Sequence, residues 1–359
     1  MSGRSTPSRG GAFGVPCLLL ALSAFAFMAH DVSAATSPSP SKQRGVSWVA
    51  ATPVVAAQLE PLATLGANWI AQEPFGWQRD PKAPEITLST SHKHAYWGES
   101  DEGIRETARL ARQKGIRTLL KPHLWVRGGT WVGDIRMDDD REWAAWFESY
   151  RTFILHYARL AEASGIEALC IGTELRSASV GHPARWRTLI REIRRVYRGR
   201  LTYAANWHGE YDQIEFWDAL DFIGVQAYFP LSQRTKPSVD ELLNGWKPAL
   251  ADLRATSRRF GKPVVFTEVG YRSTSSAAIE PWTWPEHDRG AFPEPDAETQ
   301  ARCFEAFFRT FWKETWFGGA YIWKWYPGGK PSRKDAATDF TPQGKPAENV
   351  IRSWYATAR

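Results

Sequence analysis

The sequence is poor in methionine and cysteine, with three of each among 359 residues, while tryptophan is abundant at 19 residues. Tryptophan is costly to bury fully because its N–H needs a partner, so this surplus suggests flat faces kept for ligands. Cys170 lies in an apolar strand and Cys303 on a helical pattern. We therefore expect two buried free thiols in preference to a disulfide, although an oxidising compartment would permit one.

Motifs that bind metal ions or phosphates are also missing. The chain contains no HExxH and no CxxC, and its eight histidines are scattered, so we expect no metal site and no cofactor. A doubly wound nucleotide-binding sheet usually carries a glycine-rich turn after its first strand. Residues 48–52 read WVAAT at that position, which leaves the doubly wound sheet as a weak alternative.

The charge balance is basic, with a formal net charge of +6. The densest basic patch lies between residues 187 and 200, and its spacing suits one solvated helix face. Aromatic residues do not alternate with the arginines there, as they would in many nucleic-acid sites. We expect no nucleic-acid partner. Hydrophobic residues at 43% and charged residues at 23% are typical of a soluble globular protein.

The N-terminus has the features of an export signal. Arg4 and Arg9 precede an apolar run over residues 13–29, and Val-Ser-Ala at 32–34 offers a cleavage site. We predict a signal peptide over residues 1–34 and a periplasmic or secreted protein without stable membrane association. The alternative is an uncleaved membrane anchor, which the weak hydrophobicity of the run disfavours.

A flexible tether over residues 35–43 is predicted to precede one catalytic domain, residues 44–359. In this domain strand-like runs alternate with amphipathic helical patterns. The predicted strands cover residues 44–49, 68–72, 116–121 with a continuation into 122–125, 166–171, 201–205, 222–226, a run beginning at 264, and 319–323. The predicted helices cover residues 52–66, 100–114, 138–164, 183–197, 211–219, 239–260, 297–314 and 346–356, with long loops at 73–99 and 271–295. Eight such units predict a (β/α)8 TIM barrel.

Two of the predicted strands, the fourth and the seventh, deliver Glu174 and Glu268 where each strand ends. Barrel enzymes keep their chemistry at this end of the strands. Carboxylates about 5–5.5 Å apart fit a retaining glycosidase, whereas about 6.5–9.5 Å fits an inverting one, and opposite strands of one barrel favour the shorter separation. An ion pair is the structural alternative for either residue alone. Both glutamates follow a threonine, however, and both precede an Arg-Ser pair.

Other strand ends carry side chains suited to a sugar cleft, since flat rings pack on the apolar C–H faces of pyranoses. The candidate stacking and polar residues are Trp48, Lys121, His123, Asn206, Trp207, Gln226, Tyr228, Trp323, Lys324 and Trp325. Tryptophans on the predicted loops could rim the cleft or only pack the loops, namely Trp77, Trp97, Trp131, Trp282 and Trp284.

The sequence resembles the clan A glycoside hydrolases, and within them glycoside hydrolase family 113, whose characterised members are β-mannanases. The resemblance rests on segments that span nearly all of the predicted domain, at residues 44–48 (RGVSW), 121–123 (KPH), 171–175 (IGTEL), 224–228 (GVQAY), 266–271 (FTEVGY) and 339–347 (DFTPQGKPA). It implies a retaining (β/α)8 enzyme with Glu174 as acid/base, Glu268 as nucleophile and Tyr228 hydrogen-bonded to the nucleophile.

One residue departs from the wider clan. Most clan members place asparagine before the acid/base, where it contacts the sugar 2-OH, and this chain has Thr173. The change is compatible with the axial 2-OH of a mannoside, and Asn206 is the candidate to take over the contact.

We therefore predict a retaining hydrolase of β-1,4-mannan or manno-oligosaccharides. Three alternatives stay open: another β-glycan such as a glucan, a xylan or an exopolysaccharide; glycosyl transfer in place of hydrolysis; and a catalytically dead carbohydrate-binding barrel. Loop lengths do not distinguish endo from exo action. For the oligomeric state, a monomer is the default.

Overall fold

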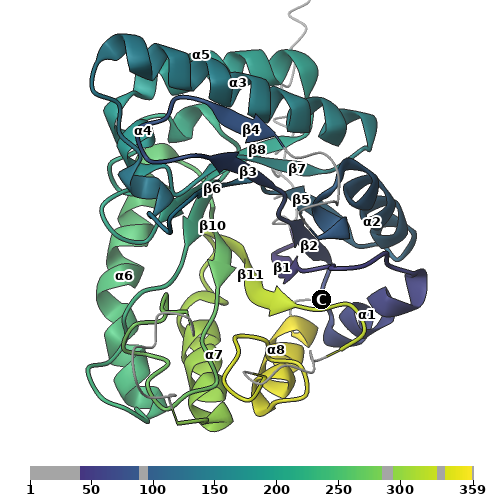
Figure 1. Cartoon of the computed structure of the whole chain (residues 1–359). Coiled ribbons are helices and arrows are strands. Elements are labelled where there is room, and N and C mark those ends of the chain that lie inside the picture. Colours follow the sequence, from purple (N-terminus) through teal and green to yellow (C-terminus); the bar gives the residue numbers. More distant parts are fainter. Residues whose placement is uncertain (1–40, 89–95, 285–293, 330–335, 358–359) are drawn as a thin grey trace, which may run out of the picture. The chain divides into compact units, whose positions relative to one another are not determined.

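The computed structural model describes residues 41–88, 96–284, 294–329 and 336–357 (Figure 1). The predicted signal peptide and all but the end of the predicted tether lie outside these residues. Eight parallel strands close into a barrel in the order β1-β11-β10-β9-β8-β7-β5-β2, which confirms the predicted TIM barrel. The strands are β1 (Gln43–Trp48), β2 (Trp69–Gln72), β5 (Arg117–Leu120), β7 (Ala168–Thr173), β8 (Arg200–Asn206), β9 (Ile223–Gln226), β10 (Val264–Val269) and β11 (Phe317–Trp325).

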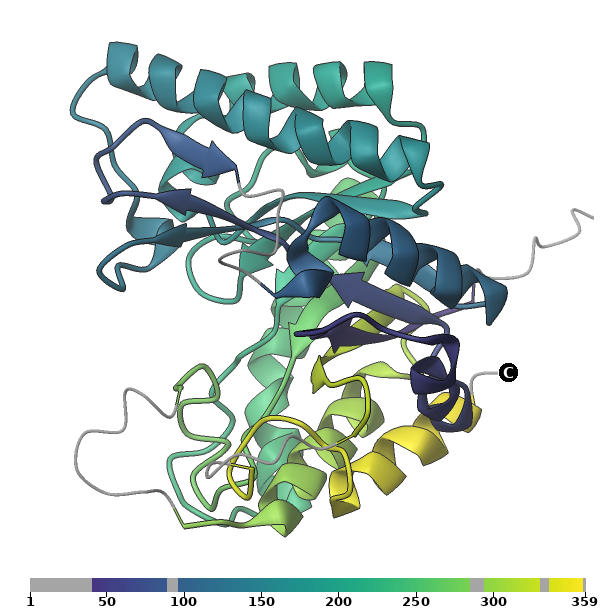
Figure 2. The same cartoon turned by 45° about the vertical axis from the view of Figure 1, so that its right-hand side comes forward.

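Helices surround the barrel (Figure 2). They are α1 (Glu60–Leu65), α2 (Asp101–Gln113), α3 (Asp140–Ala163), α4 (Arg176–Gly181), α5 (Pro183–Val196), α6 (Val239–Phe260), α7 (Ala297–Phe311) and α8 (Pro346–Ala356). Their ends follow local rules. Ser238 and Glu241 form a capping box at the start of α6, and Gly261 ends it with φ 63°. Within the described ranges, no helix has both the length and the apolar content that crossing a membrane needs.

Two predicted helices are wrong in extent. The segment 211–219 contains only a 3-10 helix, Trp217–Ala219, so β8 and β9 are joined without an α-helix. Tertiary packing overrides the helical pattern here, because Phe216 and Trp217 are fully buried and the Trp217 Nε1 donates to the Tyr211 carbonyl at 2.9 Å. Likewise, 52–66 holds a 3-10 helix (Ala56–Leu59) and the short α1.

The core has an inner and an outer part. A cluster drawn from seven of the barrel strands or their starts fills the inside of the barrel, namely Trp69, Ala71, Leu119, Ala168, Cys170, Ala204, Phe222, Val265 and Tyr321. A larger cluster packs the strands against the helices. Cys170 and Cys303 are both buried and free, as predicted.

A three-stranded sheet extends two of the barrel strands. The sequence predicted only a loop over residues 73–99, which supply two of its strands, and a continuation of the third strand into residues 122–125, where its other strand lies. The strand order of the sheet is β4 (Ile86–Leu88), β3 (Phe75–Gln78), β6 (His123–Val126). Pro74 and Pro122 separate β3 from β2 and β6 from β5. One face of this sheet packs on α3, where the Trp146 Nε1 donates to Gln78 at 3.1 Å. Aromatic residues alternate onto the opposite face.

Candidate active site

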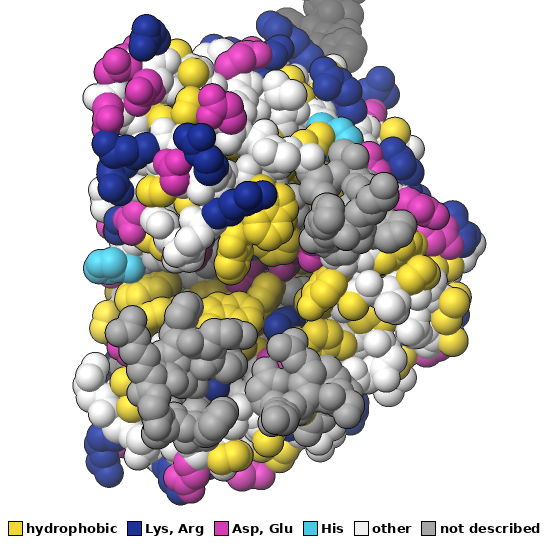
Figure 3. All heavy atoms as spheres, viewed as in Figure 1, with side chains coloured by type: hydrophobic (Ala, Val, Ile, Leu, Met, Phe, Trp, Pro, Cys, Tyr) yellow, Lys and Arg dark blue, Asp and Glu magenta, His cyan; other side chains and the backbone are white. Residues whose placement is uncertain are grey.

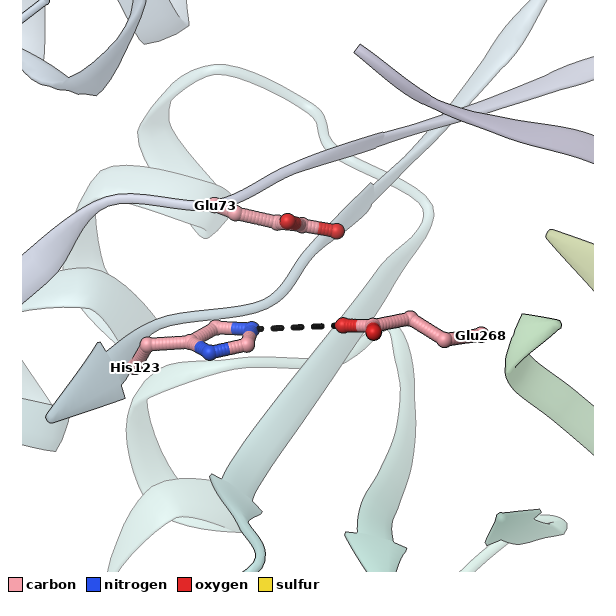
Figure 4. Close-up of side chains that lie close together, drawn as sticks. All are labelled: Glu73, His123 and Glu268. Atoms are coloured by element: carbon pink, nitrogen blue, oxygen red, sulfur yellow. Dashed lines mark ion pairs between the residues drawn. The ribbon is translucent and has the colours of Figure 1, made fainter. Parts of the chain in front are cut away.

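Glu268 lies near the end of β10 and is only 4% exposed. The Tyr228 hydroxyl donates to its Oε2 at 2.6 Å, and the Lys121 ammonium forms an ion pair and hydrogen bond with its Oε1. His123 Nε2 lies 3.9 Å from the same Oε1 (Figure 4). Burial alone would raise the pKa of Glu268, but the Lys121 charge, His123 and the hydrogen bonds from Lys121 and Tyr228 together outweigh burial and hold the pKa below its ordinary value. This side chain is therefore kept as a carboxylate.

A second carboxylate, Glu73, faces Glu268 from the end of β2 and was missed in the sequence, where it was read as the start of a loop. The Lys121 Nζ lies 3.0 Å from Glu73 Oε1 and so bridges the two carboxylates. Burial lowers the pKa of Lys121, but the two carboxylates together raise it to about 12. Burial raises the pKa of Glu73 to about 7, against the charge of Lys121.

Glu73, His123 and Glu268 are close enough together to hold a metal ion, because one possible ligand atom from each lies within 4.8 Å of the others (Figure 4). The Lys121 ammonium contacts both carboxylates at this position. A divalent cation between them would meet a like charge. The buried acidic pair is thus neutralised by lysine, and the cluster needs no metal ion to explain it.

Glu174 follows β7 directly and has a different environment. It accepts hydrogen bonds from Asn206 Nδ2 at 2.8 Å and from Trp131 Nε1 at 3.0 Å. Burial raises the pKa of the Glu174 carboxyl, the two hydrogen bonds oppose this, and the negative charge of Glu268 raises it further. The backbone of Glu174 has φ 54°, in the left-handed region. For a residue other than glycine this costs about 1–3 kcal/mol and persists only where surrounding contacts enforce it.

Trp131, predicted as a possible rim residue, reaches Glu174 because its loop is tied to the start of α4. The Arg176 guanidinium lies 4.8 Å from the centre of the Trp131 ring and also pairs with Asp134 at 3.0 Å. Ser177 donates to the Gly133 carbonyl at 2.7 Å. The residues that follow Glu174 therefore fix the loop whose tryptophan donates to Glu174.

Of the tryptophans predicted at strand ends, one lies beside the carboxylates and two lie in the core. Trp323 is 8% exposed and packs with Tyr228 and Phe340 beside the carboxylates, with the Lys121 Nζ 5.9 Å from its ring. Trp48 and Trp325 belong to the core cluster between strands and helices and are 4% and 2% exposed. Sugar stacking by these two rings stays a prediction, with little exposed area to support it.

Other predicted contacts lie around this centre. Trp207 stacks on Trp282, with ring centroids 5.2 Å apart, and Lys324 lies 4.9 Å from the centre of the Trp284 ring. The Gln226 Oε1 accepts from Thr267 Oγ1 at 2.9 Å.

Thr173 and Asn206, the two residues predicted to contact the sugar 2-OH, differ in whether they contact Glu174. Thr173 is buried, with its hydroxyl 3.9 Å from the Cys170 sulphur, whereas Asn206 contacts Glu174 itself. Trp97 is buried in the core cluster.

Figure 3 shows a furrow across the face of the protein that is turned to the viewer in Figure 1, with hydrophobic side chains on both sides and acidic side chains at its floor.

Comparison with known proteins agrees with this geometry. The β-mannanase from Alicyclobacillus acidocaldarius, solved in complex with ManMIm, is 32% identical, with 89% of this chain and 98% of that chain covered and a TM-score of 0.75. A solved β-1,4-mannanase of the same family is 27% identical, with 88% and 99% covered and a TM-score of 0.75. A β-glucuronidase from Ruminococcus gnavus, 13% identical, shares the fold over 88% of this chain and 50% of its own, with a TM-score of 0.59. No curated protein sequence gave a significant match.

The sequence profile of Glycoside Hydrolase Family 113 matches residues 42–345, which is most of the chain. That match, the barrel, and the identity to a family member across almost its whole length lead to one conclusion. The protein belongs to glycoside hydrolase family 113.

Proposed function

We propose that the protein is a retaining β-mannanase, in which Glu268 is the nucleophile and Glu174 the acid/base. One observation carries the proposal: a buried carboxyl group and a partly exposed one have pKa values displaced in opposite directions, Glu268 downward and Glu174 upward. Double displacement needs one ionised and one protonated carboxyl on a single glycosidic bond. The 32% identity to a β-mannanase supports mannan as the substrate.

In the first step the Glu268 carboxylate attacks the anomeric carbon, and the bond from that carbon to the leaving oxygen breaks. Glu174 gives its proton to the leaving oxygen as the bond breaks. The Tyr228 hydroxyl and Lys121 hold the two oxygens of Glu268, which fixes the direction of attack. The products of this step are a glycosyl ester on Glu268 and a free sugar hydroxyl.

In the second step water replaces the leaving group. Glu268 loses its negative charge when the ester forms, so one cause of the raised pKa of Glu174 disappears. Glu174 can then accept a proton from the water that attacks the anomeric carbon. Glu268 leaves as a carboxylate, and two inversions at the anomeric carbon return the original β configuration.

Buried polar atoms beside the carboxylates support a hydroxyl-rich ligand. His123 Nε2 and Trp323 Nε1 are buried, and neither has a hydrogen-bond partner within the described part of the protein. Native proteins rarely leave such atoms unsatisfied. Burial lowers the pKa of His123 to about 3, so its imidazole is neutral and can donate or accept. A pyranose offers several hydroxyls that could bond to these atoms.

The test of this function is hydrolysis of mannohexaose beside cellohexaose and xylohexaose, with products separated by chromatography. We expect mannohexaose to be cleaved and the first-formed product to be the β anomer by proton NMR. Cleavage of only cello- or xylohexaose would reassign the sugar, and a first-formed α anomer would contradict retention. Longer products would reveal glycosyl transfer, and binding without any turnover would identify a dead barrel.

A strip of aromatic rings supports an extended sugar chain as substrate. It starts at His123, beside Glu268, and follows the open face of the small sheet. Ring centroids are 5.3 Å apart from His123 to Phe75, 6.5 Å from Phe75 to Trp125, and 6.3 Å from Trp125 to Trp77. Trp125 is 49% exposed. Neighbouring ring planes are inclined to one another by 49° to 75°, so the rings form a stepped surface on which the exposed Trp125 can pack against a sugar unit.

Replacing Trp125 with alanine is expected to raise KM for mannohexaose roughly 3- to 10-fold, since an aromatic contact contributes about 0.5–1.5 kcal/mol beyond its area. An aryl mannoside, which is too short to reach Trp125 from Glu268, should keep its kcat/KM. Trp125→Phe retains a ring and serves as the control that should recover most of the affinity. An equal loss on both substrates in steady-state kinetics would argue against a sugar site on this sheet.

We also propose that the enzyme acts outside the cytoplasm as a monomer. The basis for export is the predicted signal over residues 1–34 alone. N-terminal sequencing of the protein recovered from the host's periplasm or medium is expected to begin at Ala35. A full-length protein in the membrane fraction would favour the anchored alternative.

A further inference from the structure

Glu210 is a buried carboxylate that takes no part in the steps above. It lies four residues after Asn206, in the connection between β8 and β9, and is fully buried. Three donors converge on it, each at 2.6 Å: the Ser179 hydroxyl, the Tyr203 hydroxyl and the Asn206 backbone N–H. Burial of a carboxylate is unfavourable unless such bonds compensate it.

Each of the three donor residues also forms a hydrogen bond with Glu174 or with Leu175, the next residue. The Asn206 side chain donates to the Glu174 carboxylate at 2.8 Å. The Tyr203 hydroxyl accepts the N–H of Leu175, the next residue after Glu174, at 2.7 Å. Ser179 lies on α4, and its own N–H donates to the Leu175 carbonyl at 2.8 Å.

Local packing makes room for this arrangement. A Cβ atom at Gly172, two residues before Glu174, would lie 2.6 Å from the Tyr203 ring. Glycine at this position therefore lets the tyrosine pass close to β7 and reach both Leu175 and Glu210. Glu174 itself has the left-handed backbone conformation, which needs contacts on both sides to persist.

We propose that Glu210 is the positioning residue of the acid/base: it holds Glu174 in its left-handed conformation and keeps Asn206 on the Glu174 carboxylate. The inference rests on the proposed function, in which Glu174 is the proton donor. If Glu210 served only stability, its hydrogen-bond donors could come from any part of the core. Here all three partners contact Glu174 or the residues that follow it. Burial also raises the pKa of Glu210 to about 7, against the three hydrogen bonds.

The test uses Glu210→Gln in the full chain. The amide keeps the shape of the side chain, but its NH2 group replaces an acceptor, so it cannot accept from all three donors. Two substrates separate proton donation from general damage. Mannohexaose needs a proton on its leaving oxygen, whereas 2,4-dinitrophenyl β-mannoside has a leaving group that departs without one. The kcat/KM of each reports formation of the glycosyl-enzyme.

For mannohexaose we expect a loss of about 10- to 100-fold in kcat/KM, a part of the roughly 10²–10⁴-fold that general acid catalysis contributes. For the dinitrophenyl mannoside, kcat/KM should stay near that of the wild type. Tyr203→Phe, which removes one of the three donors and the contact to Leu175, should give a smaller loss with the same selectivity. It decides the question if Glu210→Gln fails to fold.

Glu167→Gln is the matched control, because Glu167 also accepts a backbone N–H, from Thr118 at 2.8 Å, but lies before β7 at the opposite end of the barrel. It should leave both kcat/KM values unchanged. Equal losses on the two substrates in the Glu210 or Tyr203 variants, or no loss, would overturn the inference. If Glu174→Ala itself showed no selectivity between the substrates, the proposed function would fail instead.

Discussion

Replacing Glu268 with alanine is expected to lower kcat on mannohexaose by on the order of 10⁴-fold or more, the size of loss seen when a nucleophile is taken from a catalytic unit. The physical reason is that no other carboxylate can form the ester at the anomeric carbon. The Glu73 carboxylate lies within 4.8 Å of the Glu268 carboxylate, but its raised pKa of about 7 leaves it partly protonated, and Lys121 occupies its oxygen. Steady-state release of reducing sugar measures the loss.

Azide distinguishes a lost nucleophile from a damaged fold. In the Glu268→Ala protein, azide can enter the space left by the carboxylate and attack the anomeric carbon of dinitrophenyl β-mannoside directly. A single inversion then gives the α-mannosyl azide, which proton NMR identifies. Glu268→Gln fills the space and is the control that should stay inactive with azide. Formation of the β azide, or wild-type activity without azide, would show that Glu268 is not the nucleophile.

Replacing Glu174 with alanine is expected to lower kcat/KM on mannohexaose by about 10²–10⁴-fold. The dinitrophenyl mannoside should keep most of its kcat/KM, because its leaving group needs no proton, but the glycosyl-enzyme should accumulate without a base for the second step. Azide should release it as the β-mannosyl azide, after two inversions. A pre-steady-state burst of dinitrophenol, followed by slow turnover that azide accelerates, is the measurement. An α azide would contradict the assignment.

The pH profile of kcat/KM gives the second measurement on Glu174. Activity requires Glu268 ionised and Glu174 protonated, so the rate should rise as pH passes the pKa of Glu268 and fall as pH passes that of Glu174. These pKa values lie below and above the ordinary 4.5, respectively. On mannohexaose the residual activity of the Glu174→Ala protein should therefore lose the alkaline limb and keep the acid limb, and the wild type should lack the alkaline limb on the dinitrophenyl substrate, which needs no proton. Survival of the alkaline limb would assign it to another group.

Sequence patterns were sufficient for the parts of the structure that depend on local order. The apolar runs before Glu174 and Glu268 predicted strands, and a barrel brings all strand ends to one rim. The bounds of α6 were predicted to the residue, because Ser238 and Gly261 are strong start and stop signals. The small sheet was missed because residues 73–99 were read as one loop, although the chain forms β3 and β4 there; the predicted continuation of the third strand past Pro122 falls on β6.

The supporting residues of the site could not be predicted in the same way. Glu73 carried a usable signal, since it follows β2 as Glu174 follows β7. Trp131 depends on how a loop returns across the barrel mouth, which its own neighbours do not determine. Glu210 stands in a segment whose pattern predicted a helix nearby, and its three partners come from residues 4 to 31 positions away in the chain. Such contacts exist only after tertiary packing.

The closing seam of the barrel joins its first and last strands. Gly45 and Val46 pair with Tyr321 and Ile322, and Lys42 donates to the Glu314 and Phe317 carbonyls. During synthesis, β1 keeps one unpaired edge until β11, residues 317–325 of 359, has left the ribosome. An exposed strand edge can pair with another molecule. A protein truncated before β11 is therefore expected to aggregate, even though it contains Glu174, Glu268 and every earlier strand.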